Sequence, residues 1–140
     1  MGKSKKRIMV DMSATLLHHG HVRLLRKAKE LGTVIVALTT DEEIIKAKGY
    51  RPELNFEERK EILKSIQFVD EVVPCAWKLD ESFLDQHNID LLVHGSDNMN
   101  DIRDERLLIL PRTEGISTTM MRAKVLQSIS ELILNKHHVK

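Results

Sequence analysis

The run Thr33–Thr39, which reads Thr-Val-Ile-Val-Ala-Leu-Thr, constrains the fold more than any other stretch of the chain. It is rich in β-branched residues and lacks polar alternation, which is typical of a strand covered on both faces in a parallel sheet. A shorter apolar run, Ile8–Val10, precedes it, and His19–Leu31 between the two carries apolar side chains at helical spacing. Gly32 then suits the left-handed position that follows a helix. This order predicts a strand-helix-strand crossover, the repeating unit of a parallel sheet.

The same alternation continues through the rest of the chain. Strands are expected at Val69 with Glu71–Pro74, at Ile89–Gly95 and at Leu107–Leu110, and helices at Glu42–Ala47, from the cap Asn55 onward, at Asp80–His87, and from Thr118 or Thr119 to about Lys136. Three apolar side chains of the helix capped by Asn55 are expected to face inward: Ile62, Leu63 and Ile66. The pattern predicts an α/β, Rossmann-like, doubly wound fold with a five-stranded parallel sheet. We expect one domain, residues 1–140, with residues 1–6 as a flexible arm.

The charge balance bears on which partners the protein binds, and the cysteine content bears on its compartment. Lys and Arg number 22 against 21 Asp and Glu, a formal net charge of +1, so no strong field favours nucleic acid or a membrane surface. The basic run Lys3–Arg7 is interpreted as a solvated arm. Cys75 is the single cysteine, which fits a reducing compartment, and no apolar run approaches the length of a membrane span. We therefore expect a cytoplasmic protein with no nucleic-acid or membrane partner.

Three polar segments follow predicted strands, at the points where ligands bind in such sheets. They are His18-His19-Gly20-His21, Gly95-Ser96-Asp97-Asn98, and the longer segment Arg112–Thr119. In the last, Gly115 permits close backbone approach, hydroxyl groups stand at a helix start, and Arg112 can donate two hydrogen bonds to a phosphate. Histidines, an arginine and a helix N-terminus converging on one rim favour a polyphosphate ligand.

The two outer segments carry a resemblance to a known superfamily. H-x-G-H, as His18–His21, and I-S-T-T at the start of the closing helix, as Ile116–Thr119, resemble the nucleotidyltransferase superfamily and, within it, the cytidylyltransferase family. The segment R-T-E-G-I-S-T-T, Arg112–Thr119, is similar to the closing motif of the bacterial cytidylyltransferases that act on glycerol 3-phosphate. The resemblance extends over roughly residues 7–125.

This resemblance implies transfer of CMP from CTP, in which an acceptor oxygen attacks the α-phosphorus and pyrophosphate leaves. It implies catalytic roles for His18, His21, Lys48 and Arg112, with Lys48 on a mobile loop and Lys46 as the second choice for that lysine. The other residues that it implies for nucleotide binding are Met12, Ser13, Gly20, Arg59, Gly95, Asp97, Thr113, Gly115, Ile116, Ser117, Thr118 and Thr119. Mg²⁺ is expected to bind through the CTP phosphates, with no metal site on the protein itself. The resemblance also suggests a homodimer.

One departure from the family pattern lies just before the histidines. The family usually has G-T-F-D where this chain has Met12-Ser13-Ala14-Thr15. Asp11–Ala14 is similar instead to the V-D-M-[ST]-A start of cytidylyltransferase domains found with phosphoenolpyruvate mutases, which also share F-E-E-R, here Phe56–Arg59. The acceptor therefore stays open between a small phosphorylated alcohol, such as glycerol 3-phosphate, and a hydroxyalkyl phosphonate, such as 2-hydroxyethylphosphonate.

Other interpretations of the same residues also stay open. The nucleotide could be ATP, as in the adenylyltransferases of the superfamily, or the chain could bind a nucleotide without turnover, since the G-T-F-D aspartate is missing. Arg59 could be only a surface charge on its helix. Trp77 is interpreted as a core residue rather than a base-stacking one, and Met99–Asp104 as a plain loop.

Overall fold

A computed structural model of the chain describes residues 5–95 and 99–138. Its strands are β1 (Arg7–Met12), β2 (Thr33–Thr39), β3 (Glu71–Cys75), β4 (Leu91–His94) and β5 (Leu107–Ile109). Its helices are α1 (His19–Leu31), α2 (Asp41–Lys48), α3 (Phe56–Lys64), α4 (Glu81–Gln86), the short 3₁₀ helix η1 (Asp104–Arg106) and α5 (Thr118–His138). The strands form one parallel sheet in the order β3-β2-β1-β4-β5. The predicted α/β fold with a five-stranded parallel sheet is confirmed.

The structure places most element boundaries within two residues of the predicted ones. One change affects the candidate site: β1, which was expected at Ile8–Val10, runs on to Met12. Asp11 and Met12 pair with Ala37 and Leu38 of β2. Pairing with this long neighbouring strand therefore extends β1 beyond its own apolar run. This extension brings Asp11 into the carboxyl edge of the sheet.

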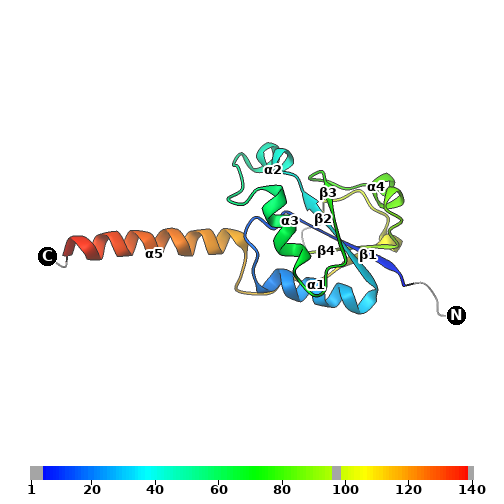
Figure 1. Ribbon diagram of the computed structural model, residues 1–140, viewed down its shortest axis with the longest axis horizontal. Coiled ribbons are helices and arrows are strands. Elements are labelled where there is room, and N and C mark those ends of the chain that lie inside the picture. The colour runs from blue at the N-terminus through cyan, green and yellow to red at the C-terminus, as the bar shows by residue number, and fades with distance from the viewer. Residues whose placement is uncertain (1–4, 96–98, 139–140) are drawn as a thin grey trace.

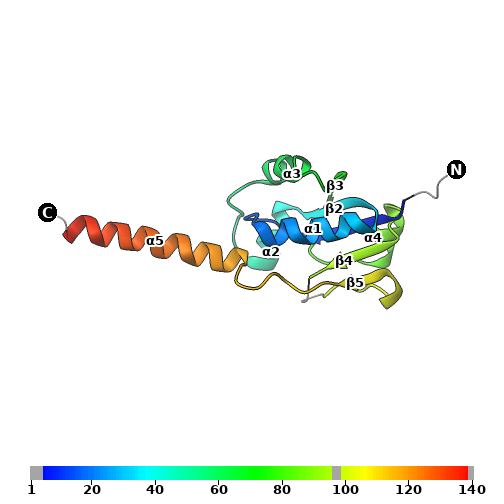
Figure 2. The same ribbon diagram turned by 90° about the horizontal axis from the view of Figure 1, so that it is seen from below.

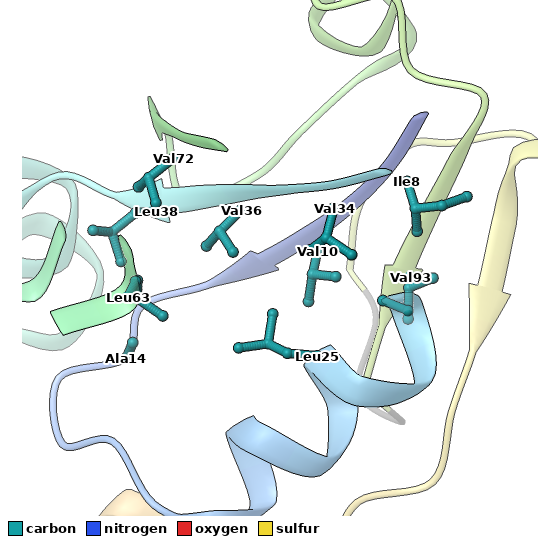
Figure 3. Packing of buried hydrophobic residues seen from close by; sticks show 11 residues of the cluster. Ile8, Val10, Ala14, Leu25, Val34, Val36, Leu38, Leu63, Val72 and Val93 are labelled. Carbon is teal, nitrogen blue, oxygen red and sulfur yellow. The ribbon is translucent and has the colours of Figure 1, made fainter. Parts of the chain in front are cut away.

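Apolar side chains cover both faces of the sheet, as the unbroken run in β2 predicts. On one face, Val10 and Val36 pack with Leu25 of α1 and Leu63 of α3 (Figure 3). On the other face, Met9, Ile35 and Leu92 pack against Leu84 of α4 and the segments around it. Successive residues of β1 and β2 therefore enter different layers of the core, which fixes the register of the sheet.

Helix α3 corrects one prediction about the core. Leu63 is fully buried and Ile66 packs against the core, as expected, but Ile62 is 40% exposed. The inward position one turn before Leu63 belongs to Arg59, whose side chain is fully buried. The inward face of α3 is therefore Phe56, Arg59 and Leu63, continued by Ile66 just past the end of the helix, and Ile62 lies beside it.

The two edges of the sheet offer little backbone for further pairing. Strand β3 at one edge contains Pro74, which has no N–H group to donate. Strand β5 at the other edge is three residues long. The sheet thus ends on both sides in strands that are short or interrupted.

Helix α5 begins beside the sheet and then projects away from the rest of the chain (Figures 1 and 2). From residue 123 to residue 136 its side chains are exposed, including Val125 (55%), Ile129 (50%) and Leu132 (57%). These three residues recur at a spacing of three to four and so lie along one side of the helix. Within the described residues, no helix is both long and apolar enough to cross a membrane.

Candidate active site

A cleft of about 570 Å³ opens at the carboxyl edge of the sheet, where the strand order reverses between β1 and β4. Thirteen of the predicted site residues line it: Met12, Ser13, His18, Gly20, His21, Lys48, Gly95, Arg112, Thr113, Ile116, Ser117, Thr118 and Thr119. Six lysine and arginine side chains face this cleft, and Asp11 supplies the one carboxylate among the described lining residues. The cleft therefore has the charge and the position of an anion-binding site.

His18 and His21 form a capping box at the start of α1. The Nδ1 atom of His18 accepts a hydrogen bond from the backbone N–H of Gly20 (3.0 Å), and the Nδ1 atom of His21 accepts one from the N–H of His18 (3.1 Å). A neutral imidazole that accepts at Nδ1 carries its proton on Nε2. Both rings therefore keep an Nε2–H donor, and their centroids lie 4.1 Å apart at the cleft.

Gly20 makes this arrangement sterically possible. A Cβ atom at this position would lie 2.7 Å from Cε1 and 2.9 Å from Nδ1 of His18, closer than real Cβ contacts come. The glycine is needed because the His18 ring folds back over the first turn of the helix. This contact explains the H-x-G-H spacing in physical terms.

Substituting Gly20 by alanine should disturb the position of the His18 ring without destabilising the fold. We expect Gly20→Ala to lower turnover about tenfold or more, because the His18 ring must move, while helix propensity gives back up to about 1 kcal/mol of stability. The measurements are steady-state rate and melting temperature on the same preparation. A variant with wild-type turnover would show that the His18 ring position is not needed.

Burial keeps both histidines neutral near pH 7. Desolvation is the main cause that lowers the pKa of His21 to about 4, and His18 and the Arg112 guanidinium lower it further. The pKa of His18 is also lowered, first by burial and then by His19. The two rings thus meet an incoming anion as neutral N–H donors rather than as cations.

This shift predicts how stability depends on pH. Between pH 6.5 and pH 4 the unfolded chain binds a proton at His21 that the folded chain does not, so folding should weaken as pH falls through this window. The contribution is at most about 3 kcal/mol. Urea unfolding of the wild type and of His21→Gln at pH 7, 5.5 and 4.5 would measure it. Equal slopes for the two proteins would contradict the shift.

The start of α5 forms the opposite wall of the cleft. The Ser117 hydroxyl accepts a hydrogen bond from the N–H of Met120 (3.1 Å) and so caps the helix. The Thr118 hydroxyl donates to the carbonyl of Leu16 (3.2 Å), which ties α5 to the turn before the histidines. A helix N-terminus directs backbone N–H groups and a partial positive charge towards an anion.

A second polar group, which the sequence reasoning missed, lies at the ends of β1 and β4. The Asp11 carboxylate, 10% exposed, lies 2.5 Å from Nδ1 of His94 and accepts a bond from Nδ2 of Asn100 (3.0 Å). Asn100 in turn accepts from the N–H of Leu79 (2.7 Å). All three polar side chains line the cleft. Met99–Asp104 is a loop up to the start of η1, as interpreted, but its Asn100 side chain holds this carboxylate at the cleft.

Arg59 does not reach the cleft, contrary to the expected nucleotide contact. Its side chain is fully buried and donates to the carbonyls of Leu54 (3.1 Å), Ser13 (2.7 Å) and Thr39 (2.9 Å) and to Asp41 (2.6 Å). It is therefore a structural residue. Because it holds the Ser13 carbonyl, it also supports the left-handed backbone of the next residue, Ala14, whose φ is 47°.

The remaining predicted residues lie at different distances from the site. Lys46 and Gly115 do not line the cleft, and Gly115 has a φ of 79° with open space around it, so its role is the turn itself. Asp97 lies outside the described residues. Trp77, interpreted as a core residue, is half-buried at the cleft, with the Lys48 ammonium 5.4 Å from its ring centroid.

Comparison with known proteins fits this geometry. A family model described as cytidylyltransferase-like matches residues 14–124. The chain belongs to the cytidylyltransferase-like family. This confirms the family expected from the H-x-G-H and I-S-T-T motifs, and the match extends from the turn before the histidines into α5.

Several relatives of this cytidylyltransferase-like chain have names that describe their substrates. A glycerol-3-phosphate cytidylyltransferase of Bacillus subtilis is 38% identical over 86% of this chain and 97% of its own length. An ethanolamine-phosphate cytidylyltransferase of Dictyostelium discoideum is 35% identical over 95% of this chain and 40% of its own length. Among solved structures, a lipopolysaccharide core biosynthesis protein of Thermoplasma volcanium aligns with a TM-score of 0.62 at 19% identity, over 77% of this chain and 96% of that one. That last likeness concerns the fold alone.

Proposed function

We propose that the chain is a cytidylyltransferase that transfers CMP from CTP to a small phosphorylated alcohol, such as glycerol 3-phosphate, and releases pyrophosphate. The observation that carries the proposal is the pair of neutral Nε2–H donors of His18 and His21 in a cleft lined by six lysine and arginine side chains. The similarity to glycerol-3-phosphate cytidylyltransferase over nearly the whole of that protein supports the choice of nucleotide and acceptor.

The proposed reaction needs alignment and charge stabilisation rather than covalent help. An anionic oxygen of the acceptor attacks the α-phosphorus of CTP, the bond to the β-phosphate oxygen breaks, and pyrophosphate leaves with that electron pair. Hydrogen bonds from His18 and His21 would strengthen as charge builds on the transferring phosphoryl group. Arg112 and the N-terminus of α5 would hold the β- and γ-phosphates.

The position of Asp11 favours a short acceptor that carries a hydrogen-bond donor at the end away from its phosphate. His94 and Asn100 each use one lone pair of the Asp11 carboxylate, and each oxygen retains further acceptor capacity. A carboxylate repels a phosphate but accepts bonds from a hydroxyl or an ammonium group. Glycerol 3-phosphate, ethanolamine phosphate and 2-hydroxyethylphosphonate all have such a tail, and a phosphonate acceptor is the second candidate because of the Asp11–Ala14 segment.

Mg²⁺ is proposed to arrive with the nucleotide. Among the described residues, no three His, Cys, Asp or Glu side chains gather to hold a metal ion. Asp11 is the one carboxylate of the described cleft lining, and it is already bonded to His94 and Asn100. The ion would therefore be coordinated by triphosphate oxygens and water, where it would neutralise the charge of the leaving pyrophosphate.

Pyrophosphate release tests the proposal directly. The protein is incubated with Mg²⁺, CTP and each of the three acceptors, with ATP as the matched alternative nucleotide. Turnover with CTP is expected, and it should be fastest with glycerol 3-phosphate. Fastest turnover with 2-hydroxyethylphosphonate would instead favour the second candidate, a phosphonate acceptor. Turnover with ATP alone would indicate an adenylyltransferase, and CTP binding without any turnover would indicate a non-catalytic module.

We also propose that two copies associate, and that the apolar side of α5 takes part. This surface is supported by the exposure of Val125, Ile129 and Leu132, because exposed helices of this kind are rarely stable without packing. Light scattering should give twice the mass of one chain for the wild type. The Leu132→Glu variant should give the mass of a single chain. A reducing, cytoplasmic location is proposed as well, because a single cysteine, Cys75, cannot form a disulfide within the chain.

A further inference from the structure

The loop between α2 and α3 is tied to α5 by a cluster of three side chains, Arg122, Glu53 and Tyr50, which we name the clamp. Arg122 donates to both carboxylate oxygens of Glu53, from Nε at 3.0 Å and from Nη2 at 2.6 Å. Its Nη1 donates to the Tyr50 hydroxyl at 2.6 Å, and its guanidinium carbon lies 4.4 Å from the centre of the Tyr50 ring. All three guanidinium nitrogens thus point to the loop.

The clamp lies immediately after the lysine that the cleft presents. Helix α2 ends at Lys48, and Gly49 in the left-handed conformation starts the loop. The far end of the loop is fixed by the capping box of Asn55 at the start of α3. Between these ends the loop is held by the clamp, by the buried Pro52, and near α3 by the carbonyl of Leu54, which accepts a hydrogen bond from Nε of Arg59 (3.1 Å). Lys48, Tyr50 and Arg122 all line the same cleft.

We propose that Arg122 is a positioning residue that holds the loop closed so that Lys48 faces the phosphates of the nucleotide. The inference rests on the proposed function, in which those phosphates occupy the cleft. Arg122 acts here through Glu53 and Tyr50 and does not itself hold a phosphate, since its two-pronged bond and its ring contact already engage the guanidinium group.

The exposure of the clamp side chains indicates that the clamp orients the loop more than it stabilises the fold. The side chains of Arg122 and Glu53 are 26% and 51% exposed, and ion pairs of this kind contribute little to folding. A two-pronged contact between segments 69 residues apart nevertheless fixes their relative orientation. Removing it should therefore change the affinity for nucleotide and leave the melting temperature nearly unchanged.

The test uses the full chain and four variants, one of them a control. Glu53→Gln and Arg122→Glu each break the clamp, and the double variant Glu53→Arg/Arg122→Glu restores it with reversed charges. Glu71→Gln is the matched control, because it removes a comparably exposed ion pair, Arg7 with Glu71 at 3.3 Å, at the start of β1 and β3. Each protein is measured for the Kd and KM of CTP, for kcat, and for the fluorescence of Trp77, the only tryptophan.

Both single variants should raise the Kd and KM for CTP about tenfold with a smaller change in kcat, and should alter Trp77 emission before any nucleotide is added, because Lys48 moves from its ring. The double variant should regain most of the affinity, and Glu71→Gln should match the wild type. A phosphate-binding Arg122 would instead give tighter CTP binding in Glu53→Gln and no recovery in the double variant, which overturns the proposal. Unchanged Kd in all variants overturns it as well.

The proposed function and the clamp fail in different ways. A wild-type protein that binds CTP but releases no pyrophosphate with any acceptor removes the proposed function, and the Kd comparison still decides on the clamp. A wild-type protein that does not bind CTP removes both.

Discussion

Replacing His18 or His21 by alanine is expected to lower the rate of pyrophosphate release by about 10²–10³-fold, the effect of removing one preorganised donor from a transition state. Each ring supplies one Nε2–H to the cleft, and each is held by a backbone hydrogen bond at Nδ1. Because the donors are fixed before substrate arrives, no reorganisation is needed as charge develops. Steady-state kinetics at saturating CTP and acceptor would measure the loss.

Two controls separate this effect from a damaged helix start. His18→Asn keeps a side chain that caps helices well, so it should preserve stability while still losing the rate. His19→Ala removes the exposed middle histidine of the same motif and should change the rate less than about twofold. If His18→Asn turned over like the wild type, the histidine would serve only as a cap.

Replacing Arg59 by methionine is expected to destabilise the protein by about 3–5 kcal/mol, as when one partner of a buried ion pair is lost. Asp41 would keep its charge beside an apolar chain, and the carbonyls of Ser13 and Thr39 would lose their described donor. Such buried groups without partners are among the costliest defects in a fold. Urea unfolding at pH 7 would measure the change in the free energy of unfolding.

A second charged residue of the same helix provides the comparison. Lys64 lies in the last turn of α3 and is exposed, so Lys64→Met should cost less than about 1 kcal/mol. Any Arg59→Met protein that folds should also turn over more slowly, because the Ser13 carbonyl and the left-handed Ala14 next to it lose their support. A cost below about 1 kcal/mol for Arg59→Met would contradict its assigned structural role.

The fold could be predicted because its signal is local. The unbroken apolar run of β2 and the amphipathic helix α1 each specify an element within a few residues of sequence, and parallel crossovers leave few ways to connect them. The end of β1 could not be predicted in the same way. Asp11 and Met12 are strand residues because Ala37 and Leu38 lie beside them, which is a tertiary fact.

The residues that line the candidate cleft could be predicted where residue type and position agreed, at the histidine corner and at the start of α5. Arg59 was misjudged because a charged residue on a helix is usually exposed. A signal was nevertheless present, since Phe56, Arg59, Leu63 and Ile66 lie on one face at helical spacing. Asp11 and His94 could also have been found, because they come at the carboxyl ends of two adjacent strands, next to the pair Val10 and Val93.

The two poor edges of the sheet restrict how this protein can aggregate. An exposed strand edge is a template on which another chain can add a strand, and that addition is a common start of fibres. Here Pro74 removes a donor from the β3 edge, and β5 offers only three residues. Copies of this chain are therefore more readily joined through side chains, such as those along α5, than by continuing one sheet into the next molecule.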